Sequence, residues 1–315
     1  MAPTAGTMIT ENVRLARPLP GARSDALWLA DQLDWRKKVV VKLLTAKLKT
    51  DDDAIVEFLE HYAPYQEIET THAVLVYDYG LTDDFVPFVV MEQLTGETVA
   101  QRLRQEDRLP PQDAAEVVAQ LADALDKAHA ESLLHLGLGP DNVFLCKTTK
   151  GMDAKVLNFG VASFTLRDRK SEYAAPEQYL SQSTDHRSDL WSLGALAYLM
   201  LTGQHAIDGD KRRMMQWDFE PPSELWLDDV PAEVDDWFTR ALHKDPEERY
   251  PSGEQMATEF HKAMHQLKDR PAEGAGIAKV IEVGTPSTAP VTKTRDVVLE
   301  EGDEDSPGIV IDVDD

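Results

Sequence analysis

The chain has 315 residues, 42% of them hydrophobic, so it is long enough to bury the core of one large domain or two small ones. Its net charge of −25 disfavours binding to nucleic acid or to an anionic membrane, because both need clustered Lys and Arg. The longest apolar stretch, residues 190–203, is too short to span a bilayer and predicts a buried helix. Residues 1–10 lack the charged and apolar regions of a signal peptide.

A single cysteine, Cys146, excludes an intrachain disulfide and a metal site built from thiolates. It lies in the apolar run VFLC, which predicts an inert, buried thiol. Together with the lack of a signal peptide, this cysteine usage favours a reducing, cytoplasmic compartment.

The first part of the chain is rich in short β-like runs. Residues 1–12 are expected to be a flexible N-terminus, and residues 13–93 contain apolar runs split by turn signals, among them VRLARPL, KKVVVKLL and FVPFVVMEQL. Within this part, DDDAIVEFLEHYAPY at 51–65 has an acidic start and helical apolar spacing, which predicts one helix.

From about residue 94 the apolar spacing becomes helical and continues to residue 268. Residues 269–315 lack this periodicity and are rich in Pro, Gly, Thr and acid, which predicts a disordered acidic tail. A strand-rich part followed by a helical part predicts an α+β fold with two lobes, a small N-lobe over 13–93 and a larger C-lobe over 94–268.

Several segments, in chain order, resemble the motifs of a protein kinase domain of the bacterial serine/threonine type. They include VVVK (39–42), the hinge-like VVMEQLTGETV, HLGLGPDN (135–142) at the catalytic loop, NFG (158–160) in place of DFG, AAPEQ (174–178), DLWSLG (189–194) and KDPEERYPS (244–252). Their shared order and spacing over residues 13–265 indicate a kinase-like fold.

The resemblance implies that the residues holding the fold together are retained. Glu177 would form a buried ion pair with Arg249, and Asp189 would hold the backbone of the catalytic loop. His135 and Phe159 would stack in the apolar column that links the two lobes.

The same resemblance implies that the residues of phosphoryl transfer are lost. Gly137 stands in place of the aspartate that accepts the substrate proton, Gly139 in place of the loop lysine, and Leu136 in place of the loop arginine. Asn158 replaces the aspartate that holds Mg²⁺, whereas Asn142 remains on the metal side. We therefore expect a pseudokinase with no catalytic activity and no bound metal.

The nucleotide site also departs from the pattern of the family. The glycines of the phosphate-covering loop would fall on Pro20, Ala22 and Asp25, leaving Gly21 out of register. In the adenine slot, where Met91 would be the gatekeeper, the bulky residues Val40 and Phe144 replace the usual Ala and Leu.

Lys42 is the exception among these losses. It would pair with a helix glutamate, but the register puts His61 at that position, with Glu60 beside it and Glu57 one turn earlier. A structural Lys42–Glu pair is favoured over a working phosphate contact. Lys42, Asn142 and Asn158 are then remnants of a nucleotide site, so no cofactor is expected apart from weak, metal-independent binding of ATP.

The tail offers two interpretations beyond an inert, solubilising role. Its threonines could be phosphorylated and dock on an Arg-lined phosphothreonine-recognition domain; they are Thr285, Thr288, Thr292 and Thr294, with Ser287 between them. The run GIVIDVDD (308–315) is suited to adding as a strand to the sheet of a partner.

The preferred function is a protein-binding scaffold or allosteric regulator, whose partner could be an active kinase. Two alternatives stay open. One is a metal-independent nucleotide sensor, and the other is an enzyme of altered chemistry with Asp141 as the nearest carboxylate.

Overall fold

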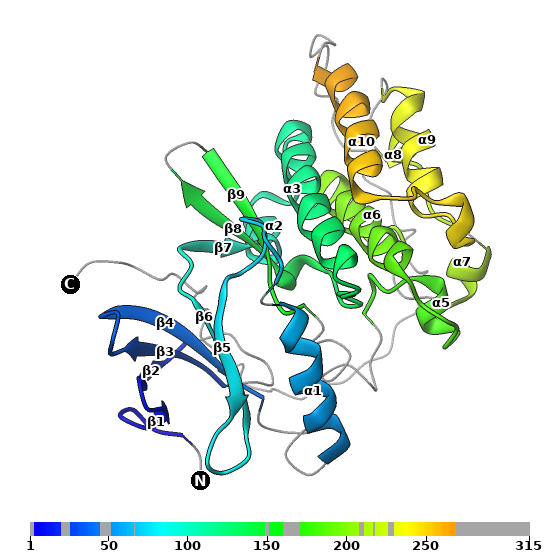
Figure 1. The fold of residues 1–315 in the computed structure, drawn as a ribbon. Coiled ribbons are helices and arrows are strands. Elements are labelled where there is room, and N and C mark those ends of the chain that lie inside the picture. The colour runs from blue at the N-terminus through cyan, green and yellow to red at the C-terminus, as the bar shows by residue number, and fades with distance from the viewer. Residues whose placement is uncertain are drawn as a thin grey trace, which may run out of the picture.

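The computed structural model describes residues 3–19, 26–44, 52–65, 67–148, 151–159, 171–207, 211–216, 218–225 and 230–268. The positions expected for the phosphate-covering loop (20–25) and the whole tail with its threonines (269–315) lie outside these residues. The described chain folds into a strand-rich N-lobe and a helical C-lobe, which confirms the predicted α+β architecture with two lobes (Figure 1).

The N-lobe is built on an antiparallel sheet with the strand order β1-β2-β3-β4-β6-β5. Its strands are β1 (Met8–Thr10), β2 (Val13–Pro18), β3 (Ala26–Gln32), β4 (Lys37–Leu43), β5 (Val76–Leu81) and β6 (Pro87–Glu92), and the accompanying helix is α1 (Asp52–Tyr65). Because side chains alternate along a strand, β4 divides its residues between two faces. Val39, Val41 and Leu43 enter an apolar cluster on one face, and Val40 belongs to a separate cluster on the other.

The sheet begins earlier than the sequence predicted. Residues 1–12 were expected to be flexible, but Met8–Thr10 form strand β1 and pair with β2. The physical reason is burial, since Ile9 lies in the same apolar cluster as Val13 and Leu15. The short run MIT, with two β-branched residues, is the sequence signal for this edge strand.

A small sheet of three strands joins the two lobes. It consists of β7 (Gly96–Thr98), β8 (Val143–Thr148) and β9 (Gly151–Val156), in that order. Gly96 has φ +144°, and a Cβ at this position would lie 2.0 Å from the carbonyl oxygen of Leu145. Only glycine therefore permits the close approach of β7 to β8.

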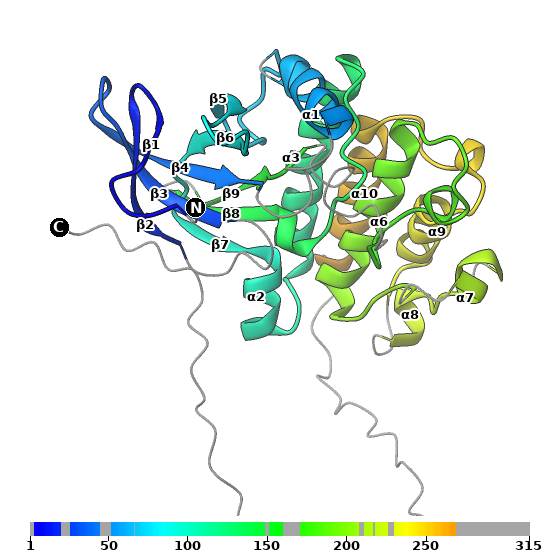
Figure 2. The same ribbon diagram turned by 90° about the horizontal axis from the view of Figure 1, so that it is seen from below.

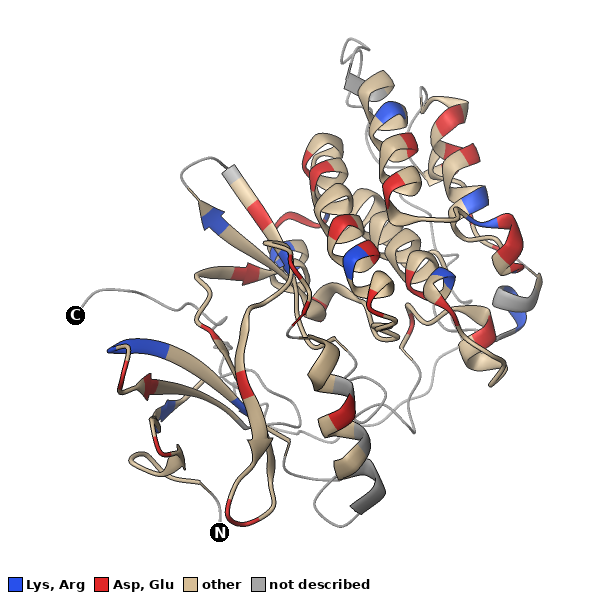
Figure 3. Cartoon of the chain, in the orientation of Figure 1, with Lys and Arg blue, Asp and Glu red and all other residues tan. Residues whose placement is uncertain are grey.

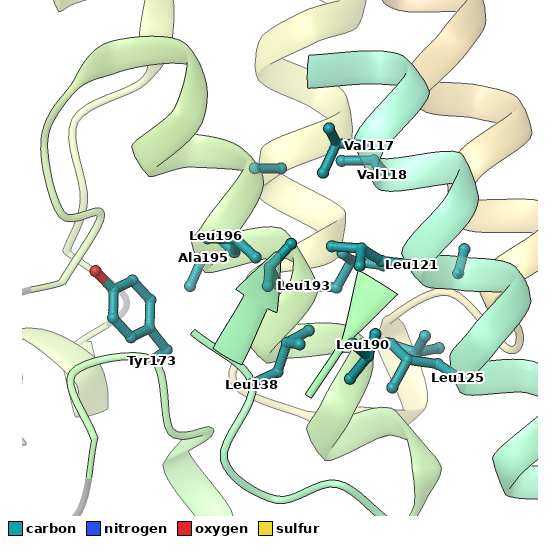
Figure 4. Packing of buried hydrophobic residues seen from close by; sticks show 14 of the residues in the cluster. Val117, Val118, Leu121, Leu125, Leu138, Tyr173, Leu190, Leu193, Ala195 and Leu196 are labelled. Carbon is teal, nitrogen blue, oxygen red and sulfur yellow. The ribbon is translucent and has the colours of Figure 1, made fainter. Parts of the chain in front are cut away.

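The C-lobe is helical and surrounds α6 (His186–Thr202), which is buried along most of its length (Figure 2). The other helices are α2 (Val99–Glu106), α3 (Pro111–Ala130), α5 (Pro176–Tyr179), α7 (Lys211–Gln216), α8 (Pro222–Leu225), α9 (Ala232–Ala241) and α10 (Gly253–Lys268), with 3-10 turns η2 (Pro140–Asn142) and η3 (Pro246–Glu248). Leu121 and Leu125 of α3 and Leu190 and Leu193 of α6 belong to one core cluster (Figure 4). No helix in the described part of the chain is both long and apolar enough to cross a bilayer.

Candidate functional site

The catalytic-loop segment is held by one buried carboxylate. Asp189 lies in the first turn of α6, and its side chain accepts hydrogen bonds from the backbone N–H of His135 (2.8 Å) and of Leu136 (2.7 Å). It also contacts Nε2 of His129 at 2.9 Å. Three contacts to one charged group fix the entry to the loop, as the sequence predicted for Asp189.

An aromatic column runs from the loop into the N-lobe. The His135 ring lies 4.9 Å from the ring of Phe159, which lies 5.6 Å from Tyr65 at the end of α1. His135 Nε2 donates to the carbonyl of Leu157 at 2.9 Å, and Nδ1 accepts from the backbone N–H of Gly137 at 3.2 Å. Burial lowers the pKa of His135, so the ring is neutral, in agreement with these two bonds. Tyr65 extends the predicted His135–Phe159 stack and was missed from the sequence.

A buried ion pair ties α5 to the segment after η3. Arg249 donates to both carboxylate oxygens of Glu177, at 2.7 and 2.8 Å, and the two residues are 2% and 4% exposed. Burial alone would raise the pKa of Glu177, but the Arg249 guanidinium and the Ser188 hydroxyl hold that pKa below its ordinary value. Arg249 also donates to the carbonyls of His243, Arg187 and Lys244, so the predicted pair is satisfied on every side.

The positions expected for catalysis carry uncharged groups that are joined in a row by hydrogen bonds. One lysine donates a hydrogen bond to the end of this row. Asn142 Nδ2 donates to the carbonyl of Gly137 at 2.7 Å, and Asn158 Nδ2 donates to Asn142 Oδ1 at 2.9 Å. Lys42 Nζ donates to Asn158 Oδ1 at 3.0 Å. The structure thus brings together all three expected remnants of the nucleotide site, and we call Lys42, Asn158, Asn142 and Gly137 the amide chain.

The amide chain contains no carboxylate. Among the described residues, no group of three or more His, Cys, Asp and Glu is arranged to hold a metal ion. The expected pairing of Lys42 with a glutamate stays a prediction, because the side chains of Glu57 and His61 lie outside the described residues, and Glu60 is exposed. Asn158 Oδ1 is one acceptor of the Lys42 ammonium.

An aromatic ring covers the position of the missing loop lysine. A Cβ added at Gly139 would lie 2.9 Å from Cδ2 of Tyr173, so the ring stands where a side chain would begin. Burial, together with the charges of Glu172 and Asp141, raises the pKa of the Tyr173 phenol far above its ordinary range. No local sequence pattern predicts this contact, since Tyr173 is more than thirty residues from Gly139.

The expected adenine slot is lined with buried, bulky side chains. Val40 packs with Leu19 and Leu29, and the partly buried Met91 lies against the same cluster. Phe144 of β8 is 7% exposed and alternates with the core residues Val143 and Leu145. Cys146 is buried on the same strand, and burial raises the pKa of its thiol to about 11, consistent with an inert thiol.

A charged contact at the end of β6 holds the hinge-like segment, and no sequence pattern predicts it. Oε1 of Glu92 accepts from Lys155 Nζ at 2.6 Å and from the backbone N–H of Leu75 at 2.8 Å. The carboxylate thereby joins β6, β9 and the segment before β5. Because both charged groups are largely buried, this link is screened less by salt than a surface pair.

The two lobes, the loop anchored by the large buried helix, and the Glu177–Arg249 pair together define a protein kinase fold. The family model of the protein kinase domain matches residues 28–261, and the chain therefore belongs to the protein kinase family.

The relatives of the chain are bacterial serine/threonine-protein kinases. The chain is 29% identical to PknB of Mycobacterium leprae over 251 residues, which cover 74% of this chain and 40% of that protein. It is also 29% identical to pkn2 of Myxococcus xanthus, over 78% of this chain and 31% of that protein. The matched region thus spans less than half the length of these relatives.

Solved structures support the fold independently. The crystal structure of the Mycobacterium tuberculosis PknI kinase domain superposes with a TM-score of 0.71, covering 83% of this chain and 100% of that chain. The sequence identity is 23%, so this likeness speaks for the fold alone.

Proposed function

We propose that this chain is a pseudokinase that acts as a protein-binding scaffold or allosteric regulator in the cytoplasm. The observation that carries the proposal is the amide chain, where an asparagine and a glycine occupy the positions of the two essential aspartates. Phosphoryl transfer depends on positioned metal ions, a carboxylate that orients the nucleophile, and donors for the phosphates. The amide chain supplies one cation, the Lys42 ammonium, and neutral amide groups.

The regulatory role is supported by what the fold retains. The contacts of Asp189 and the Glu177–Arg249 pair hold the catalytic-loop segment and α5 within the C-lobe, and the aromatic column links that loop to α1 of the N-lobe. A rigid body with a deactivated cleft suits recognition by a protein partner. We infer that this partner is a signalling protein, either an active kinase or a phosphothreonine-recognition domain that reads the tail.

A second candidate is a nucleotide sensor that works without metal. The observation in its favour is Lys42, which is buried and keeps an oxygen contact to Asn158 across the cleft between the lobes. An ammonium in this place could meet a phosphate if the Asn158 contact were exchanged.

The test is a thermal-shift titration of the full chain with ATP, with and without Mg²⁺ and Mn²⁺, followed by an assay for phosphate release and transfer. A ligand at about 100 times its Kd raises the free energy of unfolding by about 2.7 kcal/mol, which is readily measured. We expect no transfer with either metal. Metal-dependent turnover that is lost in Asn158→Ala would contradict the pseudokinase proposal.

The Lys42→Met variant distinguishes the second candidate. A thermal shift with ATP alone that disappears in Lys42→Met would establish the sensor. A shift that persists in this variant would place the nucleotide elsewhere.

A further inference from the structure

The large hydrophobic side chains that are exposed among the described residues all lie in the N-lobe. Six large hydrophobic residues are exposed in this part of the chain, and they are Met8, Leu33, Trp35, Val56, Leu75 and Phe85. All of them precede the hinge, whereas the described C-lobe has none. An exposed aromatic or aliphatic side chain is informative where it borders a cavity, and Trp35 does so.

The outer face of the N-lobe sheet holds a cavity of about 320 Å³, which we call the outer cavity. It is lined by Thr10, Glu11, Asn12, Val13, Gln32, Trp35, Tyr77, Asp78 and Val90. These residues come from the edge strands β1 and β5, from β2, β3 and β6, and from the β1–β2 and β3–β4 turns, which the curled sheet brings together (Figure 1). Its volume is at the lower end of the range of about 300–1,000 Å³ for ligand sites.

Two aromatic rings stand in the wall of the outer cavity. Trp35 and Tyr77 meet edge to face, with ring centroids 5.2 Å apart and planes at 72°. Trp35 is 51% exposed, so much of its indole is accessible to a ligand. The face of an indole is the strongest aromatic partner for a cation, and arginine is the commonest cation found there.

Two carboxylates complete a site for a cation. Glu11 and Asp78 both line the outer cavity and are exposed. Arg36 and Lys37 follow Trp35 but are absent from the lining, and Lys and Arg are visible at the start of β4 (Figure 3). The lining itself is therefore negatively charged, with basic residues only outside it.

A buried amide points to a peptide rather than a free cation. Gln32 lines the cavity and is 9% exposed, and its Oε1 accepts from the backbone N–H of Asp34 at 2.9 Å. Its Nε2 donates to no group among the described residues. This NH₂ group is open to the cavity, so a peptide carbonyl that enters the cavity would accept a hydrogen bond from it.

We propose that the outer cavity binds an arginine side chain on an extended segment of a partner protein. The guanidinium stacks on Trp35 and faces Glu11 and Asp78, while a neighbouring carbonyl of the segment accepts from Gln32. The acidic run at 308–315 of this chain does not match, because it would bring further carboxylates to the same wall. This surface lies outside the cleft between the lobes, so the proposal is independent of catalysis and of nucleotide.

The test is a titration of ¹⁵N-labelled full chain with the peptide acetyl-Gly-Arg-Gly-amide, followed through the tryptophan indole signals. The chain has 6 tryptophans, and the Trp35→Phe variant assigns the signal of Trp35. We expect a saturable shift of this signal, and binding about tenfold weaker for the same peptide with uncharged citrulline.

Two variants test whether the carboxylates that line the outer cavity bind the peptide. Glu11→Gln combined with Asp78→Asn should weaken binding about tenfold, because it removes both charges and keeps both shapes. Phe85→Ala is the matched control, since Phe85 is 67% exposed on the same lobe but does not line the cavity. Its affinity should equal that of the wild type, and both variants should keep the wild-type dispersion of the other indole signals.

Three results would overturn the proposal. The first is no movement of the Trp35 signal at millimolar peptide, and the second is equal binding of the arginine and citrulline peptides. The third is a Trp35 signal that moves with protein concentration alone or on deletion of 269–315, which would assign the outer cavity to a second copy or to the tail.

Discussion

Two sets of residues, which we call the anchoring half and the reacting half, differ in the kind of side chain that they contain. The anchoring half, made of His135, Asp189, Glu177 and Arg249, consists of buried polar groups with complete hydrogen bonding. The reacting half has glycine at 137 and 139 and asparagine at 142 and 158. In the first half each charge has its partner, and the four positions of the second half carry no charged side chain.

This difference teaches which constraints act on each half. A buried charge is costly when its partner is missing, so loss of one anchoring residue endangers the whole fold. A catalytic carboxylate contributes to the reaction rather than to the stability of the fold. An amide in its place therefore leaves the fold intact. The residues that hold the catalytic-loop segment and α5 in place are thus distinct from the residues of the amide chain.

The largest expected effect comes from breaking the buried pair. Arg249→Ala leaves Glu177 charged and unpaired in the interior, and we expect the free energy of unfolding to fall by about 3–5 kcal/mol. Urea unfolding of the full chain measures it. The control is Lys262→Ala on α10, whose pair with Glu259 is exposed and should matter by less than about 1 kcal/mol. Equal effects of the two substitutions would contradict a structural role of Arg249.

The next effect comes from Asp189→Asn. An amide keeps the shape but puts an NH₂ group against the N–H donors that the carboxylate accepts, so we expect a loss of about 2–3 kcal/mol. Asp185→Asn is the matched control, because Asp185 caps the same helix and asparagine caps as well as aspartate. A loss that is no larger at Asp189 than at Asp185 would show that Asp189 is not the anchor of the loop.

A smaller effect tests the reacting half. Gly139 has extended backbone with φ −173°, so Gly139→Ala costs no backbone strain and reports the clash with Tyr173 alone. We expect a loss of about 1–3 kcal/mol, because the ring must move. The same substitution in a Tyr173→Leu background should cost at least about 0.5 kcal/mol less. Strict additivity in this double-mutant cycle would show that the ring does not fill the space.

The smallest effect depends on pH. Burial lowers the pKa of His135 in the folded chain, whereas the unfolded chain keeps the ordinary value of about 6.5. Below that pH the unfolded state binds a proton that the folded state does not, so stability is lost as the pH falls. The loss is at most about 1.4 kcal/mol per pH unit, and His135→Gln should lower the slope accordingly. An unchanged slope would mean that other titratable groups cause the dependence of stability on pH.

The fold could be predicted because its signals are local or are repeated along the chain. HLGLGPDN, AAPEQ and KDPEERYPS stand in a fixed order, and this order identified Asp189 and the partners Glu177 and Arg249 before any contact was known. Strand β1 escaped prediction because three residues are too short to show a period.

The rest of the site could not be predicted, because it depends on contacts between distant segments. Tyr173 over Gly139, Lys155 on Glu92 and Tyr65 on Phe159 each join residues that no spacing rule connects. The same holds for the outer cavity, where two edge strands meet only because the sheet curls. Side-chain partners of this kind follow from tertiary packing rather than from periodicity.

The hydrogen bonds between Asn158, Asn142 and the Gly137 carbonyl have a consequence for how the cleft responds to its surroundings. Salt weakens contacts between charges over a Debye length of about 8 Å at physiological ionic strength, and it acts little on bonds between neutral dipoles. These hydrogen bonds between neutral amides therefore keep their geometry through changes in ionic strength and acidity. Changes in the ions of the cell would therefore act little on the hydrogen bonds among these three residues.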